Sequence, residues 1–268
     1  MNVLVLGGSG LLGSALVYVL EQRCHRVLAP TRSEYDVLAG PLPASLLSGS
    51  HVVVNAAFAK PPVERELDRK LNAEFPQGLA RLCAAANVPL IHFSTDGVFS
   101  ARTGPCDESV PPVPDEENGL HKLMGEPRSC LVIRTSALVG PENRGFHSIL
   151  CWFLSQEREA PGFTNQWWNG VTSPTLALAV ARLIETGTIP TGIRHMCAED
   201  VTKFELLVRL AKVFKRKIEI KPTLAPIARD RRLRTRFPEF LATCDVPSLD
   251  AQLAELPALA DERGRWRT

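Results

Sequence analysis

The chain has 268 residues, of which 45% are hydrophobic and 22% are charged. These values are ordinary for a soluble globular protein, and the length suits one large α/β domain with room for a small lobe. The formal net charge of +2 argues against nucleic acid or a membrane surface as a partner, and no apolar run reaches the ~20 residues of a membrane-spanning helix.

The first residues predict a buried strand followed by a helix. Residues 2–6 (NVLVL) form a continuous apolar run, as expected of a parallel strand that is covered on both faces. Residues 14–23 then place Leu16, Val19 and Leu20 at helical spacing. This start lacks the basic leading region and the cleavage site of a signal peptide, so we read it as the first β–α unit of the fold.

Further strands and helices alternate as far as residue 140. The expected strands are residues 26–30, 51–57, 89–99 (running into a loop) and 130–140, and the expected helix is residues 71–87. Alternating strands and helices predict a doubly wound α/β fold, with a parallel sheet connected by right-handed crossovers.

The pattern loosens after residue 140. We expect a turn at Asn169-Gly170 and a helix with Ser173 as its N-cap and Pro174 as its first residue. A late strand at residues 192–198 and an amphipathic helix at residues 202–214 follow, and the proline-rich tail from Pro222 onward has no α/β rhythm.

Three glycines, Gly7, Gly10 and Gly13, form a G-x-x-G-x-x-G loop that contains Ser9. One glycine would make the tight strand-to-helix turn, one would let the backbone approach a pyrophosphate, and one would let helix and strand pack closely. The helix N-terminus would offer free N–H groups to the phosphates. Because the loop opens the first β–α unit, it predicts a Rossmann-type dinucleotide-binding fold rather than a turn without a ligand.

The residues after the second strand bear on the choice of dinucleotide. An acidic residue there would bind the adenosine ribose and favour NAD(H). The sequence has Pro30, Thr31 and Arg32 instead, and Arg32 either faces a 2′-phosphate or is an exposed loop residue. We expect NADP(H) or NAD(H), with a weak preference for NADP(H).

Two units are expected. Residues 1–160, continued by about 170–200, would form the dinucleotide-binding domain, and residues 201–268 with parts of 141–170 would form a small C-terminal substrate lobe. We interpret the basic run at 228–236 as a solvated face, with contact to a phosphate-bearing ligand as the alternative.

Seven cysteines are scattered singly, without a CxxC pair, and the six histidines do not cluster with them. We therefore expect reduced thiols, no metal site and a cytoplasmic protein.

Five short motifs lie along the chain in a characteristic order and spacing. They are GGSGLLG (7–13), NAA (55–57), STDGVF (94–99), GLHKLMGE (119–126) and VIRTS (132–136). Together they resemble the extended short-chain dehydrogenase/reductase family, in the branch that contains dTDP-4-dehydrorhamnose reductase. Residues 162–179 resemble the segment in which proteins of that branch return to the core after the substrate loop, so the resemblance extends to about residue 200.

The resemblance implies a reductase of nucleotide-linked 4-keto-6-deoxysugars that uses NAD(P)H. In this family a lysine binds the nicotinamide ribose, a tyrosine gives a proton to the carbonyl oxygen, and a serine or threonine holds that oxygen. The resemblance assigns the first role to Lys122 and the third to Thr95, with Asp96 beside Thr95 at the substrate. It also implies cofactor contacts for Leu11, Leu12, Asn55, Ala56 and Ala57.

Asn118 stands where the resemblance predicts the tyrosine. Asn118 and Lys122 are four residues apart, which places them on one face of a helix, but an amide cannot act as a general acid at pH 7. Gly97 also stands where relatives carry a tyrosine. The chain has two tyrosines, Tyr18 and Tyr35, and neither segment is expected to reach the nicotinamide.

His121 is interpreted as a surface histidine, because it points about 100° away from Lys122 around the helix. Leu120, Leu123 and Met124 mark the apolar side of this helix. Thr95, Asp96 and a water molecule remain open as proton sources, and Asp96 would need a raised pKa for that role.

Two functions are consistent with these residues. The first is an NAD(P)-dependent oxidoreductase, or a related epimerase or dehydratase, that acts on a nucleotide-linked (keto-deoxy) sugar with altered or impaired proton-donor chemistry. General acid catalysis typically contributes ~10²- to 10⁴-fold, so losing it would slow catalysis without abolishing cofactor binding. The second is a catalytically silent dinucleotide- or nucleotide-sugar-binding protein with a regulatory role. Either way the expected partner is a nucleotide-sugar-like small molecule, and a homodimer is left open.

Overall fold

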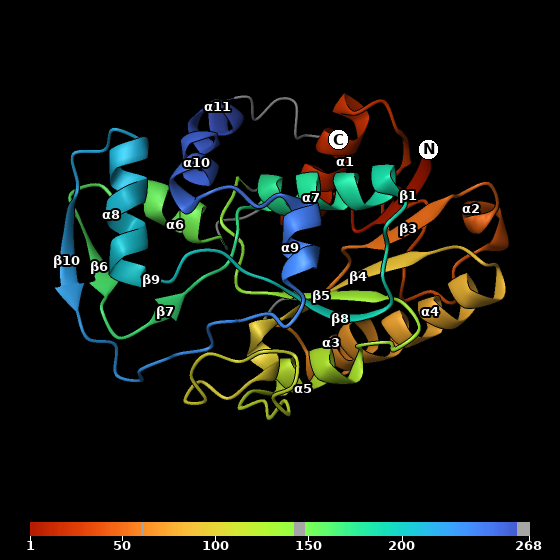
Figure 1. Cartoon of the computed structure of the whole chain (residues 1–268), viewed down its shortest axis with the longest axis horizontal. Helices are drawn as coiled ribbons and strands as arrows, with labels where there is room; N and C mark the ends of the chain where they lie inside the picture. The colour runs from red at the N-terminus through yellow and green to blue at the C-terminus, as the bar shows by residue number, and fades with distance from the viewer. Residues whose placement is uncertain (60–61, 142–147, 262–268) are drawn as a thin grey trace.

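A six-stranded parallel sheet forms the centre of the computed structural model, which describes residues 1–59, 62–141 and 148–261 (Figure 1). Neighbouring strands follow the order β2-β1-β3-β4-β5-β8 and all pairs are parallel. The strands are β1 (Asn2–Leu6), β2 (Arg26–Leu28), β3 (Val52–Asn55), β4 (Leu90–Thr95), β5 (Leu131–Thr135) and β8 (Gly192–Met196). The predicted parallel α/β sheet is confirmed. Its chain order reverses at β1, which is where open α/β sheets bind their ligands.

Helices cover both faces of this sheet (Figure 1). One layer holds α1 (Leu11–Gln22), α7 (Ser173–Thr186) and α9 (Pro238–Cys244). The other holds α2 (Ala44–Leu47), α3 (Arg65–Arg69), the π-helical turn η1 (Lys70–Glu74), α4 (Phe75–Ala85) and α5 (Glu117–Met124). Strand β1 alternates between the layers, with Val3 and Val5 in the first core and Leu4 and Leu6 in the second. This two-sided burial explains why the strand reads as an unbroken apolar run.

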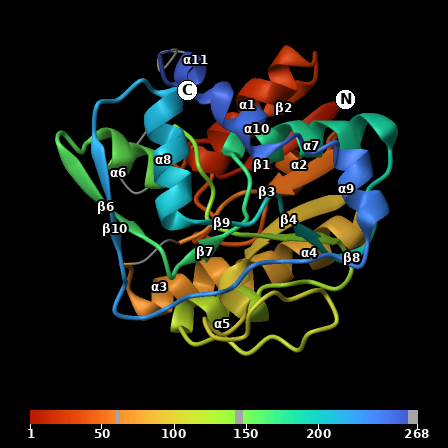
Figure 2. The same cartoon turned by 60° about the vertical axis from the view of Figure 1, so that its left-hand side comes forward.

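A smaller group of elements lies beside the main sheet (Figure 2). It contains α6 (Ile149–Leu154), β6 (Glu159–Phe163), β7 (Trp167–Trp168), β9 (Val201–Thr202), α8 (Lys203–Val213), β10 (Glu219–Thr223), α10 (Leu249–Ala254) and α11 (Leu256–Asp261). β6 pairs with β10 in parallel, and β7 pairs with β9 antiparallel. The group has its own hydrophobic core, which includes Phe153, Trp168 and Leu206.

The N-cap of α7 differs from the sequence-based expectation. Thr172, not Ser173, is the cap, and its hydroxyl accepts a hydrogen bond from the backbone N–H of Thr175 at 3.3 Å. Ser173 is already the first helical residue, so the prediction was wrong by one position. Both residues carry the hydroxyl that a cap needs, and the extended backbone of Thr172 decides between them.

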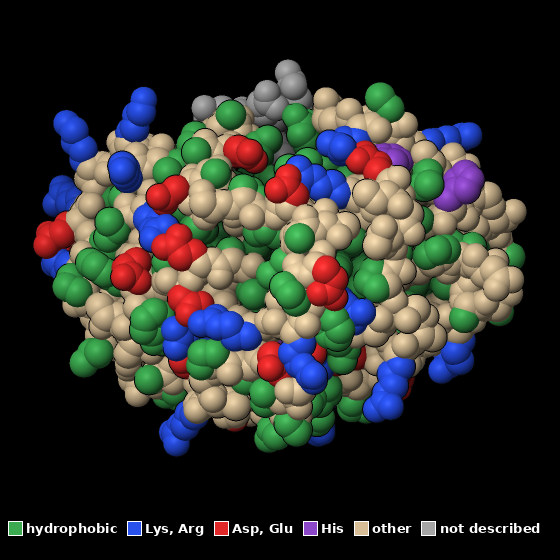
Figure 3. Space-filling view, viewed as in Figure 1, with side chains coloured by type: hydrophobic (Ala, Val, Ile, Leu, Met, Phe, Trp, Pro, Cys, Tyr) green, Lys and Arg blue, Asp and Glu red, His purple; other side chains and the backbone are tan. Residues whose placement is uncertain are grey.

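The amphipathic helix expected at residues 202–214 is confirmed as α8, which begins with a capping box between Thr202 and Glu205. All seven cysteines are free thiols. Among the described residues, no helix is long and apolar enough to cross a membrane, and no three acidic, histidine or cysteine side chains gather as metal ligands. On the face viewed in Figure 3, acidic and basic side chains are interspersed, in keeping with the small net charge.

Candidate active site

The glycine loop joins β1 to α1 with no room for side chains at two positions. Gly7 has a φ of +79°, and a β-carbon there would lie 2.6 Å from the Ala57 nitrogen. A β-carbon at Gly13 would lie 2.0 Å from the Gly7 carbonyl oxygen. Gly10 caps α1 without a side-chain hydrogen bond. The loop therefore brings β1, α1 and the segment after β3 into close contact and leaves the start of α1 open to a ligand.

A cavity of about 470 Å³ lies against this loop. Of the residues predicted to contact the cofactor, Gly7, Ser9, Gly10, Arg32, Ala56 and Ala57 line it. Gly13 instead packs beneath the loop, and the Leu12 side chain is buried in the core. Asn55 is also buried, where its amide meets His92 at 3.1 Å and accepts a hydrogen bond from the Ala57 N–H. Asn55 thus shapes the cavity wall from behind rather than facing the space.

The rim of the cavity at the end of β2 is polar and exposed. Arg32 is 76% exposed and its guanidinium lies 3.0 Å from Asp36. The Thr31 hydroxyl contacts Ser33 and donates to Glu34. Tyr35 also lines the cavity, but its hydroxyl donates to the Gly40 carbonyl at 3.1 Å, away from the carboxyl end of β4.

Lys122 lies on α5 and is almost fully buried. Its ammonium donates to the Phe93 carbonyl of β4 at 2.7 Å and lies 5.8 Å from the ring centre of Phe58, a residue of the cavity wall. Burial lowers the pKa of Lys122 to about 8, although the carboxylates of Glu126 and Asp68 oppose this change. Lys122 thus places a positive charge at a fixed position between β4 and the cavity wall.

Asn118 is bound to a neighbouring helix. Its amide donates to the Asp68 carboxylate at 2.7 Å and to the Ala59 carbonyl at 3.4 Å. Asp68, which is 4% exposed, also accepts from Asn72 at 2.5 Å and contacts His121 Nδ1 at 2.9 Å. We call Asp68, Asn72, Asn118 and His121 the Asp68 cluster. It fixes α5 on α3 and η1 and engages the N–H donors of the Asn118 amide.

Two expectations about α5 were wrong. His121 is 4% exposed, so it is not a surface histidine, and Leu120 and Met124 are 46% and 53% exposed. The helix instead buries a face that begins at Gly119, where a β-carbon would lie 2.3 Å from the Gly97 carbonyl oxygen. This close approach and the polar Asp68 cluster orient the helix, and of its two leucines only Leu123 packs against a hydrophobic cluster.

Thr95 ends β4, and Asp96 begins the 3₁₀ turn η2 (Asp96–Val98). The Thr95 hydroxyl donates to the Asp96 carboxylate at 3.1 Å and accepts from the Gly97 N–H at 3.0 Å. Burial raises the pKa of the Asp96 carboxyl. The hydroxyls of Ser136 and Thr95 and the cations Arg231 and Lys203 oppose this rise without cancelling it.

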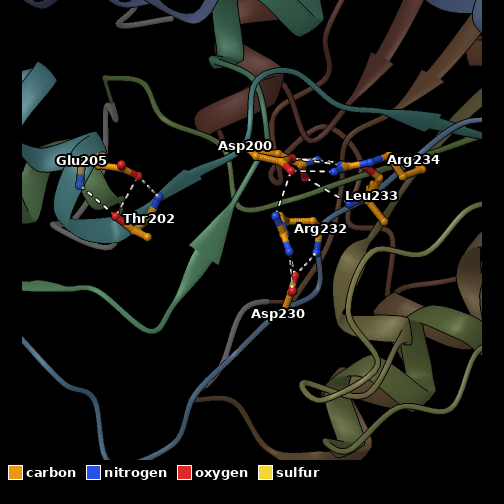
Figure 4. A network of polar contacts seen from close by, with 8 residues as sticks. Asp200, Thr202, Glu205, Asp230, Arg232, Leu233 and Arg234 are labelled. Carbon is orange, nitrogen blue, oxygen red and sulfur yellow. Dashed lines mark hydrogen bonds and ion pairs between the residues drawn. The ribbon is translucent and has the colours of Figure 1, made fainter.

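The basic run, residues 228–236, crosses this end of the sheet, and we call it the basic strap. Arg232 and Arg234 form ion pairs with Asp200, and Arg232 also pairs with Asp230 (Figure 4). The side chains of Arg231 and Arg232 are 12% and 18% exposed, so the interpretation as a solvated face was wrong for them. The charges are instead compensated by buried or half-buried carboxylates.

Comparison with known proteins identifies the family to which this chain belongs. The sequence model described as the RmlD substrate binding domain matches residues 1–235. The chain belongs to this family. The resemblance to the dTDP-4-dehydrorhamnose reductase branch is thereby confirmed.

Known proteins are similar to this chain over most of its length. A probable low-salt glycan biosynthesis reductase of Haloferax volcanii is 27% identical, with 96% of this chain and 98% of the relative covered. A dTDP-4-dehydrorhamnose reductase of Streptomyces griseus is 31% identical, with 72% and 69% covered. The crystal structure of dTDP-4-dehydrorhamnose reductase from Bacillus anthracis in complex with NADP superposes with a TM-score of 0.80 at 20% identity, covering 96% and 99%.

Sequence reasoning on this family member missed several residues of the candidate site. They are Asp68, Asn72, Ser136, Lys203 and Arg231. Asp68 and Asn72 did carry a local signal, because an acid and an amide four residues apart share a helix face. Arg231 belongs to the basic run at 228–236, but nothing in that run indicated its position at the end of β4, and Lys203 carried no signal. Both reach this place from segments more than a hundred residues away in the sequence.

Proposed function

We propose that this chain is an NAD(P)H-dependent reductase of a nucleotide-linked keto-deoxysugar in which Asp96, acting through Thr95, delivers the proton. The chain is a member of a sugar-nucleotide reductase family, and relatives bear that activity in their names. The observation that carries the proposal is the 3.1 Å contact between the Thr95 hydroxyl and a partly buried carboxyl at the carboxyl end of β4.

The residues present fit a dinucleotide. Gly7 and Gly13 leave a cradle that a β-carbon would fill, and the adjoining cavity is lined by Ser9, Gly10 and Ala57. Backbone N–H groups at the start of α1 would hold the pyrophosphate, and Lys122 would hold the nicotinamide ribose. When bound, the reduced dinucleotide supplies a hydride. Thr31, Arg32 and Ser33 place two hydroxyls and one guanidinium at the rim, beside the carboxylates of Glu34 and Asp36. Because the exposed Arg32 could turn from Asp36 to a 2′-phosphate, we include NADPH as the preferred form.

The proton follows a short path in this proposal. When Asp96 is protonated, its O–H donates to the Thr95 oxygen, and the Thr95 hydroxyl is free to point at the substrate. Thr95 then gives its proton to the oxygen of the former carbonyl and takes one from Asp96, and Asp96 is reprotonated from solvent. Burial raises the pKa of Asp96, which increases the protonated fraction at neutral pH. Asn118 has no part in this path, because its amide is bound to Asp68 and Ala59.

A second candidate is a silent binding protein, and the same Asn118 contacts favour it. In that case the fold holds a dinucleotide or nucleotide sugar without turnover, and the Asp68 cluster only stabilises α5.

Single-turnover oxidation of NADPH with a panel of dTDP- and UDP-linked keto sugars separates the candidates. We expect measurable turnover that falls by about 100-fold in Asp96→Asn, in line with loss of a general acid. Asn118→Ala should retain the wild-type rate constant. Glu117→Gln is the control, because it makes the same acid-to-amide change as Asp96→Asn on an exposed carboxylate, and it should also retain the wild-type rate constant. Equal rate constants for the wild type and Asp96→Asn contradict the proposed path. Tight binding by calorimetry without any turnover supports the silent binding protein.

A further inference from the structure

The side chain of Arg231 lies close to Thr95. Residue 97 has no side chain, and a β-carbon there would lie 3.4 Å from the Thr95 hydroxyl oxygen and 3.9 Å from Arg231 Nη1. The hydroxyl and the guanidinium thus border the same space at the end of β4. An oxygen atom that accepts a hydrogen bond from Thr95 would lie within reach of the arginine.

The backbone of the basic strap fixes the direction of this side chain. The strap pairs with residues 101–106 through hydrogen bonds such as Asp230 N–H to the Ala101 carbonyl and Cys106 N–H to the Arg232 carbonyl, both 2.8 Å. In such an extended segment, successive side chains point to opposite sides. Arg232 and Arg234 face Asp200, as Figure 4 shows, whereas Leu233 packs against Val98 and Phe99. Arg231 therefore points with Leu233 toward η2 and away from the Asp200 ion pairs.

The guanidinium of Arg231 is not used up by the ion pairs around it. Its nearest carboxylates, Glu116 and Asp115, are 3.5 Å and 3.7 Å from Nη2. Among the described residues, Nε and Nη2 have no hydrogen-bond partner although both atoms are buried. By contrast, Arg232 makes hydrogen bonds to both Asp200 and Asp230. Leaving buried donors unpaired is costly, and an acceptor on a bound ligand would remove that cost.

We propose that Arg231 donates a hydrogen bond to the carbonyl oxygen of the sugar and stabilises the negative charge that forms there. This inference rests on the reductase function proposed above. The hydride forms the new C–H bond, the carbonyl π electrons move to the oxygen, and the dinucleotide is oxidised. Arg231 and Thr95 hold the resulting alkoxide until the Thr95 proton neutralises it. The arginine supplies charge and no proton, since a guanidinium stays protonated throughout the working pH range.

The test compares Arg231→Gln with Arg229→Gln, which removes the same charge from the same strap at a side chain paired with Glu116. Single-turnover rate constants for NADPH oxidation are measured from about pH 6 to pH 9. We expect Arg231→Gln to lower the rate constant by about 100-fold at every pH, as for loss of one donor to an oxyanion, and Arg231→Lys to lower it less. NADPH affinity should not change, and Arg229→Gln should match the wild type.

A merely electrostatic role of Arg231 on Asp96 gives a different result. Removing the cation would then raise the pKa of Asp96 further and shift the pH profile toward higher pH, while the plateau would stay the same. Such a shift without a lower plateau, or equal rate constants for the two glutamine variants, overturns the proposal.

A chain without turnover would refute the reductase function, and binding then decides the role of Arg231. Calorimetry compares a nucleotide-linked keto sugar with the free nucleoside diphosphate. If Arg231→Gln weakens binding of the keto sugar at least about fivefold and leaves the diphosphate unaffected, the contact with the sugar oxygen stands. If both affinities are unchanged, or if both fall equally, the contact is refuted.

Discussion

The two halves of the candidate site are built in different ways. The dinucleotide half consists of backbone: Gly7, Gly10 and Gly13 bring β1, α1 and the end of β3 together, and few side chains matter. The substrate half consists of side chains from three distant segments, namely Thr95 and Asp96, Lys122 of α5, and Arg231 of the basic strap. A site made of backbone depends on local spacing, whereas a site made of side chains depends on tertiary packing. The second kind can therefore exchange its reactive groups while the first remains intact.

The largest expected effect comes from the buried ion pair beneath the substrate half. Arg134 of β5 forms two hydrogen bonds of 2.8 Å and 2.7 Å with Glu126, which follows α5, and both side chains are at most 4% exposed. Arg134→Met should lower the free energy of unfolding by about 3–5 kcal/mol, because the buried Glu126 loses both guanidinium hydrogen bonds and keeps only the Ser94 hydroxyl and the nearby charge of Lys122. Urea denaturation measures the change.

The exposed pair of Arg23 and Glu185 provides the control for this experiment. Arg23→Met should cost no more than about 1 kcal/mol, as is usual for surface ion pairs. A loss below that value for Arg134→Met would mean that α5 is held to β5 by apolar contacts alone.

In the dinucleotide half, Gly13→Ala should disrupt both stability and binding. The new β-carbon would clash with the Gly7 carbonyl oxygen at 2.0 Å and with Gly8 at 2.8 Å, so the loop must move. We expect a loss of about 1–3 kcal/mol in the free energy of unfolding and at least about a 100-fold weaker affinity for NADPH. Thermal denaturation and fluorescence titration measure the two effects.

Gly10→Ala is the matched variant, because a β-carbon at Gly10 meets only the Gly7 oxygen, at 3.4 Å. It should leave stability nearly unchanged and weaken NADPH binding alone, since Gly10 lines the cavity. Equal losses of stability in the two variants would show that the loop is not close-packed at Gly13.

The same contrast explains what could be predicted from the sequence. The parallel sheet and the glycine loop follow from local patterns, and the structure has both. The orientation of α5 does not, because eight residues make only about two turns and the buried face depends on contacts of Gly119 and Gly125 with Gly97 and Asn72. The spacing of Asp68 and Asn72 indicates that they share a helix face, but the helix that lies opposite Asp68, like the elements that lie opposite Arg231, cannot be read from spacing within either segment.

The pH dependence of stability sharpens the comparison at Lys122, where the two halves meet. Burial lowers the pKa of this lysine from 10.5 to about 8. Between these values the unfolded chain binds more protons at residue 122 than the folded chain does, so this residue makes stability rise with pH. The penalty for burying the charge is fully present below about pH 8 and is relieved toward pH 10.5. Lys122→Met removes this penalty. Its free energy of unfolding relative to the wild type should therefore fall by an amount on the order of 2 kcal/mol between about pH 7.5 and pH 10.

Urea denaturation at both pH values provides this measurement. Lys217→Met makes the same substitution on an exposed side chain and serves as the control. A stability difference between Lys122→Met and the wild type that does not vary with pH would show that the ammonium is well solvated in the folded chain.

The smallest effect is expected at the exposed rim of the dinucleotide half. Arg32 is 76% exposed and, among the residues that the structure describes, forms an ion pair only with Asp36, so it can turn toward a phosphate at little cost. Arg32→Gln should reduce the ratio of NADPH to NADH affinity by about five- to tenfold at low salt and by less at high salt, because exposed charges are screened. Arg26→Gln removes the same charge at the opposite end of β2 and should leave the ratio unchanged. If Arg32→Gln weakens NADH and NADPH binding equally, the side chain contacts a part common to both dinucleotides, and the preference for NADPH must be sought in the hydroxyls of Thr31 and Ser33.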